Sequence, residues 1–148
     1  MMHETNLEKA LEIKLQGNDC YKKSEFESAV SLYTEAIQTC PLSKKTDLSI
    51  MYQNRAAAQE RLEQLESALQ DCQESLRLNN RYGKSYDRRS KILKKVVDKL
   101  DNTKLDDKIL HLRQALEDVS VLAQLDGYQQ QQLLMVDEIL KQLGKHCC

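Results

Sequence analysis

The chain has 148 residues, with 22 Lys and Arg against 23 Asp and Glu, and it contains only 4 Gly, 1 Pro, 1 Phe and no Trp. Leu, Glu, Lys, Gln and Ala dominate and favour helices, whereas a sheet of this size would need more turn formers and more β-branched and aromatic residues. A strand-rich fold is therefore excluded, and we expect a single all-α domain. No apolar run exceeds four residues, so we also expect no membrane span and no signal-peptide core.

Five cysteines do not form a recognisable framework. They include no Cys-x-x-Cys pair, and their odd number and irregular spacing argue against a secreted disulfide scaffold. No Cys and His residues stand at metal-ligand spacing, so we expect no metal and no cofactor. A reducing compartment, either the cytosol or a cytosol-facing surface, is the best prediction.

Apolar residues recur with helical periodicity along the whole chain. In chain order, this predicts helices at about 7–23, 26–40, 46–62, 65–78 and 82–100. Ser24 and Thr46 are candidate N-caps, and Gly144 is a candidate helix stop. Two later helices should each present one apolar face, formed by Leu105, Ile109, Leu112, Leu116 and Val119 in the first and by Leu133, Val136, Leu140 and Leu143 in the second.

An internal repeat organises the first two thirds of the chain. From Gly17, offsets of 12, 16, 19 and 24 residues reach Ala29, Tyr33, Ala36 and Pro41, and from Ala56 the same offsets reach Ala68, Cys72, Ser75 and Asn80. Small residues thus recur where two antiparallel helices would cross closely. From Ala56 to Ser90 is 34 residues, the period of the tetratricopeptide repeat (TPR), whereas Gly17 to Ala56 is 39, which indicates a longer turn after Pro41.

The repeat predicts the domain organisation. We expect a TPR module at 1–100, with repeats at about 7–41 and 46–80 and a third starting near 82. Residues 101–148 would complete the third repeat and supply a C-terminal capping helix, because a stack of repeats otherwise ends on an uncovered apolar face.

Five polar residues fall on helices that line the inner groove of a TPR array. Lys14 and Asn18 lie one helical turn apart, Asn54 lies on the third helix, and Lys84 and Arg88 are again one turn apart. Three basic groups and two amides in one groove would favour an anion, with Lys supplying compact charge, Arg a fork for bidentate contact and Asn neutral donors. The sequence therefore predicts a site for two carboxylates.

This set resembles the dicarboxylate clamp of TPR co-chaperones, which bind the C-terminal Glu-Glu-Val-Asp tail of the seventy- and ninety-kilodalton heat-shock chaperones. The resemblance implies that Lys14, Asn18 and Asn54 hold the terminal carboxylate. It also implies that Lys84 and Arg88 take the aspartate side chain and upstream peptide groups. The same positions by themselves would often be solvated charges of a helix surface, and only their joint match favours a clamp.

Within the clamp proteins, the chain is similar to the Tom-seventy type of import receptor in the mitochondrial outer membrane. The segments that carry this likeness are Gly17-Asn18, Tyr33 to Ile37, Cys40-Pro41, Thr46 to Ser49, Tyr52 to Ala58, Asp71-Cys72, Leu78-Asn79, Arg88-Arg89, Leu116 to Val119 and Leu140 to Gly144. Receptors of that type have an N-terminal membrane anchor and a longer C-terminal array that binds precursor proteins, and these 148 residues contain neither. The resemblance therefore implies chaperone docking more directly than binding of mitochondrial precursor proteins.

Other classes of function fit less well. There is no His-Glu-x-x-His, no glycine-rich loop and no credible nucleophile with an acid and a base, so we expect no enzyme and no catalytic residue. A nucleic-acid binder is disfavoured by the net charge of −1 and by the single Phe. The remaining alternative is a soluble TPR scaffold or co-chaperone that holds a partner helix in its groove and has no role in import.

Overall fold

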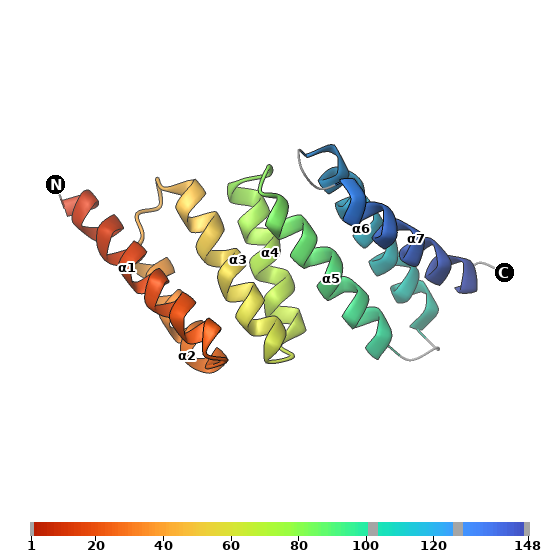
Figure 1. The fold of residues 1–148 in the computed structure, drawn as a ribbon, viewed down its shortest axis with the longest axis horizontal. Helices are drawn as coiled ribbons and strands as arrows, with labels where there is room; N and C mark the ends of the chain where they lie inside the picture. The colour runs from red at the N-terminus through yellow and green to blue at the C-terminus, as the bar shows by residue number, and fades with distance from the viewer. Residues whose placement is uncertain (1, 101–103, 126–128, 147–148) are drawn as a thin grey trace. The chain divides into compact units, whose positions relative to one another are not determined.

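The structure is a computed structural model that describes the backbone of residues 2–100, 104–125 and 129–146. In these residues it contains seven α-helices and no strand, which confirms the predicted all-α fold (Figure 1). The helices are α1 (Met2–Lys22), α2 (Phe26–Thr39), α3 (Lys45–Arg61), α4 (Leu65–Leu78), α5 (Gly83–Lys99), α6 (Leu105–Gln124) and α7 (Gln129–His146). None of the helices in the described part of the chain is both long enough and apolar enough to cross a membrane.

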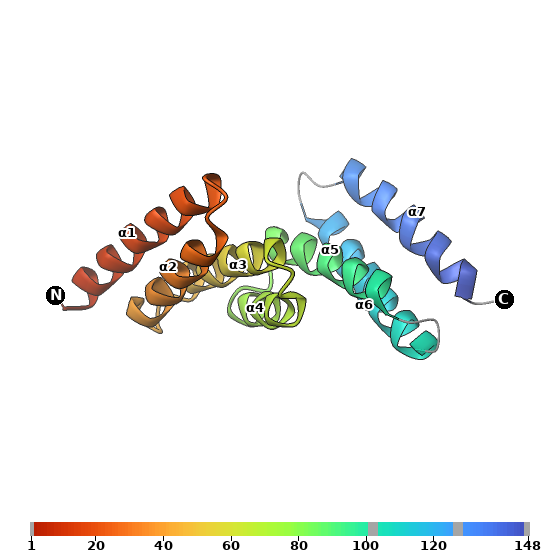
Figure 2. The same ribbon diagram turned by 90° about the horizontal axis from the view of Figure 1, so that it is seen from below.

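The chain forms two compact units, unit 1 at Met1–Tyr82 and unit 2 at Gly83–Cys148. Within unit 1, α1 packs on α2, α2 on α3, and α3 on α4. Figure 2 shows α1 and α2 lying side by side, and Figure 1 shows the same for α3 and α4. Within unit 2, α6 packs against both α5 and α7. Antiparallel helix pairs are the building blocks of each unit, as the repeat predicted.

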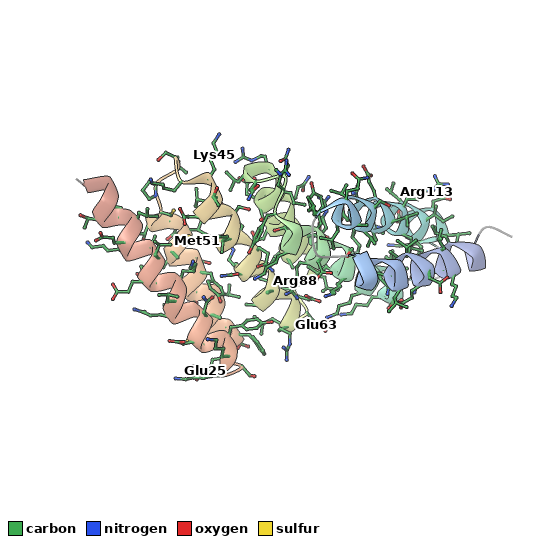
Figure 3. All side chains as sticks on the ribbon, turned by 45° about the horizontal axis from the view of Figure 1, so that its top comes forward. Glu25, Lys45, Met51, Glu63, Arg88 and Arg113 are labelled. Atoms are coloured by element: carbon green, nitrogen blue, oxygen red, sulfur yellow. The ribbon has the colours of Figure 1, made fainter. Side chains whose placement is uncertain are left out.

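Small residues bring the helices of unit 1 close together. Ala10 on α1 and Ala36 on α2 are fully buried beside Met51 of α3, which is labelled in Figure 3. Between α3 and α4, Ser49 and Ser75 are also fully buried, and each hydroxyl donates a hydrogen bond of 2.8 Å to the backbone carbonyl of the other residue. These reciprocal bonds fix the register of α3 against α4.

Gly17 marks the closest approach of α1 to α2. A Cβ atom at this position would lie 2.7 Å from Cε1 and 2.9 Å from Cδ1 of Tyr33, closer than real Cβ atoms come to other atoms. Tyr33 is itself buried, with 2% of its surface exposed. The small residue at the start of the first repeat is therefore required by the aromatic residue 16 positions later.

Two turns of unit 1 have the same backbone geometry. Ser24, between α1 and α2, has φ 62°, and Glu63, between α3 and α4, has φ 60°. In the first turn the backbone N–H of Glu25 donates a hydrogen bond of 2.9 Å to the carbonyl of Cys20, five positions earlier. In the second turn the N–H of Gln64 donates a bond of the same length to the carbonyl of Gln59. This is the Schellman motif, which ends a helix with one left-handed residue.

The predicted helix ends are partly wrong. Ser24 is no N-cap, because it occupies the left-handed position and α2 starts after Glu25, which makes no side-chain cap hydrogen bond. Thr46 lies inside α3, whose N-cap is Lys44. Gly144 is no helix stop, because α7 continues to His146.

The face of α7 that is buried within unit 2 also differs from the prediction. Ile139 is fully buried, and Sδ of Met135 lies 3.7 Å from the Ser90 hydroxyl of α5. Leu140, predicted to be buried, is 51% exposed, and Leu134 is 76% exposed. Of the predicted face, Val136 and Leu143 are half-buried, and the side chain of Leu133 lies outside the described residues. The helix is thus rotated by about one residue from the predicted orientation.

The apolar face of α6 is closer to its prediction. Leu112 and Val119 are fully buried as expected, and the same face also includes Ala115 and Leu122. Leu105, at the first position of the helix, is 37% exposed.

Candidate functional site

Three of the five predicted site residues lie in unit 1. Lys14 and Asn18 are one turn apart on α1, and Asn54 is on α3. All three side chains are half-buried. Nδ2 of Asn54 donates a hydrogen bond of 3.2 Å to Oδ1 of Asn18, so the fold joins two predicted residues that are 36 positions apart.

A tyrosine that the prediction did not include completes this group. The hydroxyl of Tyr33, on α2, donates a hydrogen bond of 2.6 Å to the same Oδ1 atom of Asn18. One amide oxygen therefore accepts bonds from two helices, α2 and α3. Because the oxygen faces Tyr33 and Asn54, the NH2 end of Asn18 points away from both and is directed to other acceptors.

Burial keeps the Tyr33 hydroxyl protonated. The loss of solvent, together with smaller effects of the neighbouring Tyr21 and Cys20, raises the pKa of Tyr33 to about 12. The hydroxyl is thus a hydrogen-bond donor over the whole neutral pH range. The donor set of unit 1 consists of the ammonium of Lys14 and the amide groups of Asn18 and Asn54, which suits a carboxylate.

The other two predicted residues lie in unit 2. Lys84 is exposed in the first turn of α5, and Arg88, labelled in Figure 3, is half-buried one turn later. The residues near them on α5 have ion-pair partners of their own. Lys91 pairs with Asp87 at 2.8 Å, and Lys94 pairs with Glu138 of α7 at 2.6 Å.

An ion pair in unit 1 lies one residue beyond Asn54. Arg55 donates two hydrogen bonds to the carboxylate of Asp71 on α4, at 2.6 and 2.8 Å, and a third of 3.2 Å to the hydroxyl of Thr34 on α2. Its guanidinium also lies 5.4 Å from the ring centre of Tyr52. The hydrogen bonds to Asp71 hold the pKa of Arg55 above its usual value. This pair links α2, α3 and α4, and so holds Asn54 in place.

Unit 2 contains the matching ion pair. Arg89, next to Arg88, donates two hydrogen bonds of 2.7 and 2.6 Å to Asp118 of α6, and its guanidinium lies 6.0 Å from the ring of Tyr86. Gln114 donates a further bond of 3.1 Å to the same carboxylate. Because Arg89 is fixed on one face of α5, the adjacent Arg88 is directed to a different face.

Sequence reasoning missed Tyr33 and both ion pairs as supports of the site. Tyr33 was identified only as a repeat position. A signal for the ion pairs was present, because the pattern Tyr-x-x-Arg occurs at Tyr52 and again 34 residues later at Tyr86. In the described residues, no three His, Cys, Asp or Glu side chains gather in a way that could hold a metal ion.

Comparison with curated proteins identifies relatives of nearly the whole chain. It is 42% identical over 141 residues to the human mitochondrial import receptor subunit TOM70, and 41% identical over 142 residues to the rat protein of that name. Each alignment covers 95% of this chain and 21% of the relative, so the chain spans about a fifth of the length of these receptors. Mouse DnaJ homolog subfamily C member 7 is 39% identical over 83 residues, which is 55% of this chain and 17% of that protein. No family model matches the sequence.

Comparison with solved structures confirms the TPR fold. The first TPR domain of Spaghetti (RPAP3), solved with the HSP90 peptide SRMEEVD, aligns with a TM-score of 0.75 and 24% identity over 93% of this chain and 97% of that one. The TPR domain of Arabidopsis OM64 aligns with a TM-score of 0.74 and 24% identity over 92% and 98%. The TPR2B domain of yeast Sti1, in a complex with an Hsp70 peptide, gives a TM-score of 0.69 at 22% identity over 90% and 98%.

Proposed function

Because this chain is a TPR-domain relative of the TOM70 import receptors, we propose that it is a docking module for heat-shock chaperones in mitochondrial protein import. It binds the C-terminal Glu-Glu-Val-Asp tail of seventy- and ninety-kilodalton chaperones. It does so on the cytosolic side of the mitochondrial outer membrane, where the chaperone delivers a precursor protein.

The contact between Asn18 and Asn54 carries this proposal. A terminal carboxylate needs several donors from different helices, and the hydrogen bond of 3.2 Å places two amides from α1 and α3 side by side. Lys14, one turn before Asn18, adds a positive charge to the same part of unit 1. Among the solved TPR domains with this fold, that of Spaghetti (RPAP3) carries an HSP90 peptide and that of Sti1 an Hsp70 peptide.

Lys84 and Arg88 are assigned to the aspartate side chain and the upstream peptide groups. This assignment follows the resemblance to clamp proteins, in which a Lys and an Arg stand one turn apart on the fifth helix. Arg suits this role because its planar fork binds a carboxylate through two parallel hydrogen bonds.

Peptide titration tests the proposal. A free-acid peptide that ends in Glu-Glu-Val-Asp should bind, and the same peptide with a C-terminal amide should bind much more weakly. Asn54→Ala and Arg88→Ala should each weaken binding of the acid by about ten- to hundredfold, because a hydrogen bond to a charged group is worth about 1.5–3 kcal/mol. Isothermal titration calorimetry measures both effects, and helical circular dichroism checks that the variants fold.

The control is Lys91→Ala, an exposed basic residue on the same helix whose partner is the half-buried carboxylate of Asp87. It removes one positive charge from α5 and no proposed site residue. Lys94 suits this purpose less well, because its ammonium joins α5 to α7. If Lys91→Ala weakens the peptide as much as Arg88→Ala does, the attraction comes from a diffuse basic surface and the five-residue site is wrong. If wild-type protein binds the acid and the amide equally, the module holds some other kind of segment, such as a partner helix.

A further inference from the structure

The Tyr33 hydroxyl fixes which end of the Asn18 amide faces the ligand. We propose that Tyr33 is a positioning residue that makes the unit 1 site select a carboxylate over a carboxamide. The proposal rests on the proposed function, since it concerns the ligand of that same site.

The hydrogen-bond distances determine the orientation of the Asn18 side chain. An amide can be turned so that either its oxygen or its nitrogen faces a neighbour, and a tyrosine hydroxyl can donate or accept. The distance of 2.6 Å to Tyr33 is typical of an O–H···O bond and short for an N–H···O bond, whereas the 3.2 Å to Asn54 Nδ2 fits an N–H···O bond. Both distances place the oxygen of Asn18 toward its two neighbours in the protein.

This orientation determines what the site can recognise. The oxygen of Asn18 already accepts two hydrogen bonds, so only its NH2 group is available to a ligand. A carboxylate offers acceptors only and matches that group, as it matches the ammonium of Lys14. A carboxamide keeps one acceptor oxygen and has an NH2 group in place of the other, so one of the donors of Asn18 and Lys14 would meet a second donor. A donor that is left without an acceptor at this half-buried site is costly, so the amide binds more weakly.

Burial makes this arrangement rigid. The Tyr33 ring packs against Gly17 on α1, where an added Cβ would lie 2.7 Å from the ring. With the hydroxyl removed, Asn18 loses the shorter of the two hydrogen bonds that hold its oxygen inward, and only the bond of 3.2 Å from Asn54 remains. Its side chain can then turn over and present either end to a ligand.

The test uses Tyr33→Phe, which keeps the ring and removes only the hydroxyl. The dissociation constants of the free-acid and amide peptides are measured for this variant and for wild type. The ratio of the two constants should fall by about three- to tenfold, which is the effect of a single hydrogen bond. The matched control is Tyr21→Phe, because the Tyr21 ring contacts Phe26 at a centroid distance of 5.3 Å and its loss of a hydroxyl removes neither of the two hydrogen bonds to the Asn18 oxygen. That variant should keep the wild-type ratio.

The outcomes separate positioning from general loss of structure. An unchanged ratio of the two dissociation constants in folded Tyr33→Phe overturns the proposal. This includes the case in which both peptides bind more weakly by the same factor, since a structural role would affect them alike. If Tyr33→Phe does not fold, nuclear magnetic resonance of the wild-type protein decides the question. The side-chain NH2 signals of Asn18 should move on addition of the acid and stay in place with the amide, and equal movement with both overturns the proposal. Failure of wild-type protein to bind the acid peptide at all would instead overturn the proposed function.

Discussion

The arginines of the two ion pairs lie in the same sequence pattern, but their aspartate partners are at different distances along the chain. Arg55 and Arg89 are 34 residues apart, and each follows a tyrosine at the third position before it. The partner of Arg55 is 16 residues downstream, at Asp71, whereas the partner of Arg89 is 29 residues downstream, at Asp118. The repeat therefore fixes the position of the arginine, and the packing of the second helix decides which aspartate meets it.

The surroundings of the two pairs also differ. Asp71 is 7% exposed, and Arg55 has additional contacts with Thr34 and the Tyr52 ring. Asp118 is only 1% exposed and receives its additional hydrogen bond from Gln114 on its own helix. In unit 1 Arg55 has a hydrogen bond outside the pair, to Thr34, and in unit 2 Asp118 has one, from Gln114. Removal of the carboxylate should therefore have unequal effects.

The largest expected effect is that of Asp118→Ala. It should lower the free energy of unfolding by about 3 kcal/mol, because it removes from the half-buried guanidinium of Arg89 a carboxylate partner that is only 1% exposed. Asp71→Ala should cost less, since Asp71 is 7% exposed against 1% for Asp118 and Arg55 keeps its bond to Thr34. Urea unfolding followed by circular dichroism measures both losses. Asp87→Ala, which breaks an exposed pair on α5, serves as the control and should cost only a few tenths of a kcal/mol. A loss at Asp71 as large as that at Asp118 would contradict the comparison.

A second comparison concerns the first small residue of each repeat, Gly17 and Ala56. Ala56 is accommodated on α3 at 0% exposure, whereas a Cβ at Gly17 would overlap the Tyr33 ring. Gly17→Ala should therefore destabilise the protein by about 1–3 kcal/mol, despite the better helix propensity of Ala. Thermal unfolding is the measurement. Gly144→Ala, where an added Cβ would meet nothing within 4 Å, should raise the melting temperature slightly. An unchanged melting temperature for Gly17→Ala would show that α1 and α2 can separate at no cost.

The smallest expected effect concerns the equivalent turns at Ser24 and Glu63. Both residues have a left-handed backbone that disfavours any side chain, so glycine should stabilise each turn by about 0.5–1 kcal/mol. The gain should be similar at the two sites if the turns are as alike as their hydrogen bonds indicate. Ser24→Ala keeps the Cβ atom and should give no gain, and urea unfolding distinguishes it from Ser24→Gly. A loss of stability in Ser24→Gly would mean that the serine side chain has a role that its backbone angle does not reveal.

Helix positions could be predicted from the sequence because burial imposes a period of 3.6 residues on one face of each helix. The predicted range 65–78 is that of α4, and the other early helices differ from their predictions mainly at the ends. Helix starts were harder to predict. Serine is a residue type that favours N-caps, but Ser24 lies in a Schellman turn. Two different turn types can use the same residue, and only the backbone angles separate them.

The orientation of α7 could not be predicted for a related reason. The run Leu133-Leu134-Met135-Val136 offers apolar side chains in every direction around the helix axis, so periodicity does not select one face. The choice depends on which side chains fit α5 and α6, and Ile139 and Met135 do.

The sequence was sufficient to predict the charged and amide residues of the candidate site. It was not sufficient to predict Tyr33 and the two ion pairs that support them. Lys14 and Asn18 stand at a spacing that a helix puts on one face, so the sequence is sufficient to group them. The bond between Tyr33 and Asn18 joins residues of two helices, and its existence depends on how closely α1 and α2 pack at Gly17. No local pattern contains that distance.

The way the helices begin has a consequence for how the protein opens. The residues before α2, α3, α4 and α6, namely Glu25, Lys44, Gln64 and Lys104, make no side-chain cap hydrogen bond. At 14 residues, α2 and α4 are also at the length where an isolated helix is only marginally stable in water. Each helix therefore owes its order to the neighbour it packs against. Transient opening should accordingly release helices in pairs, so that the smallest cooperative unit of the molecule is a hairpin of two helices.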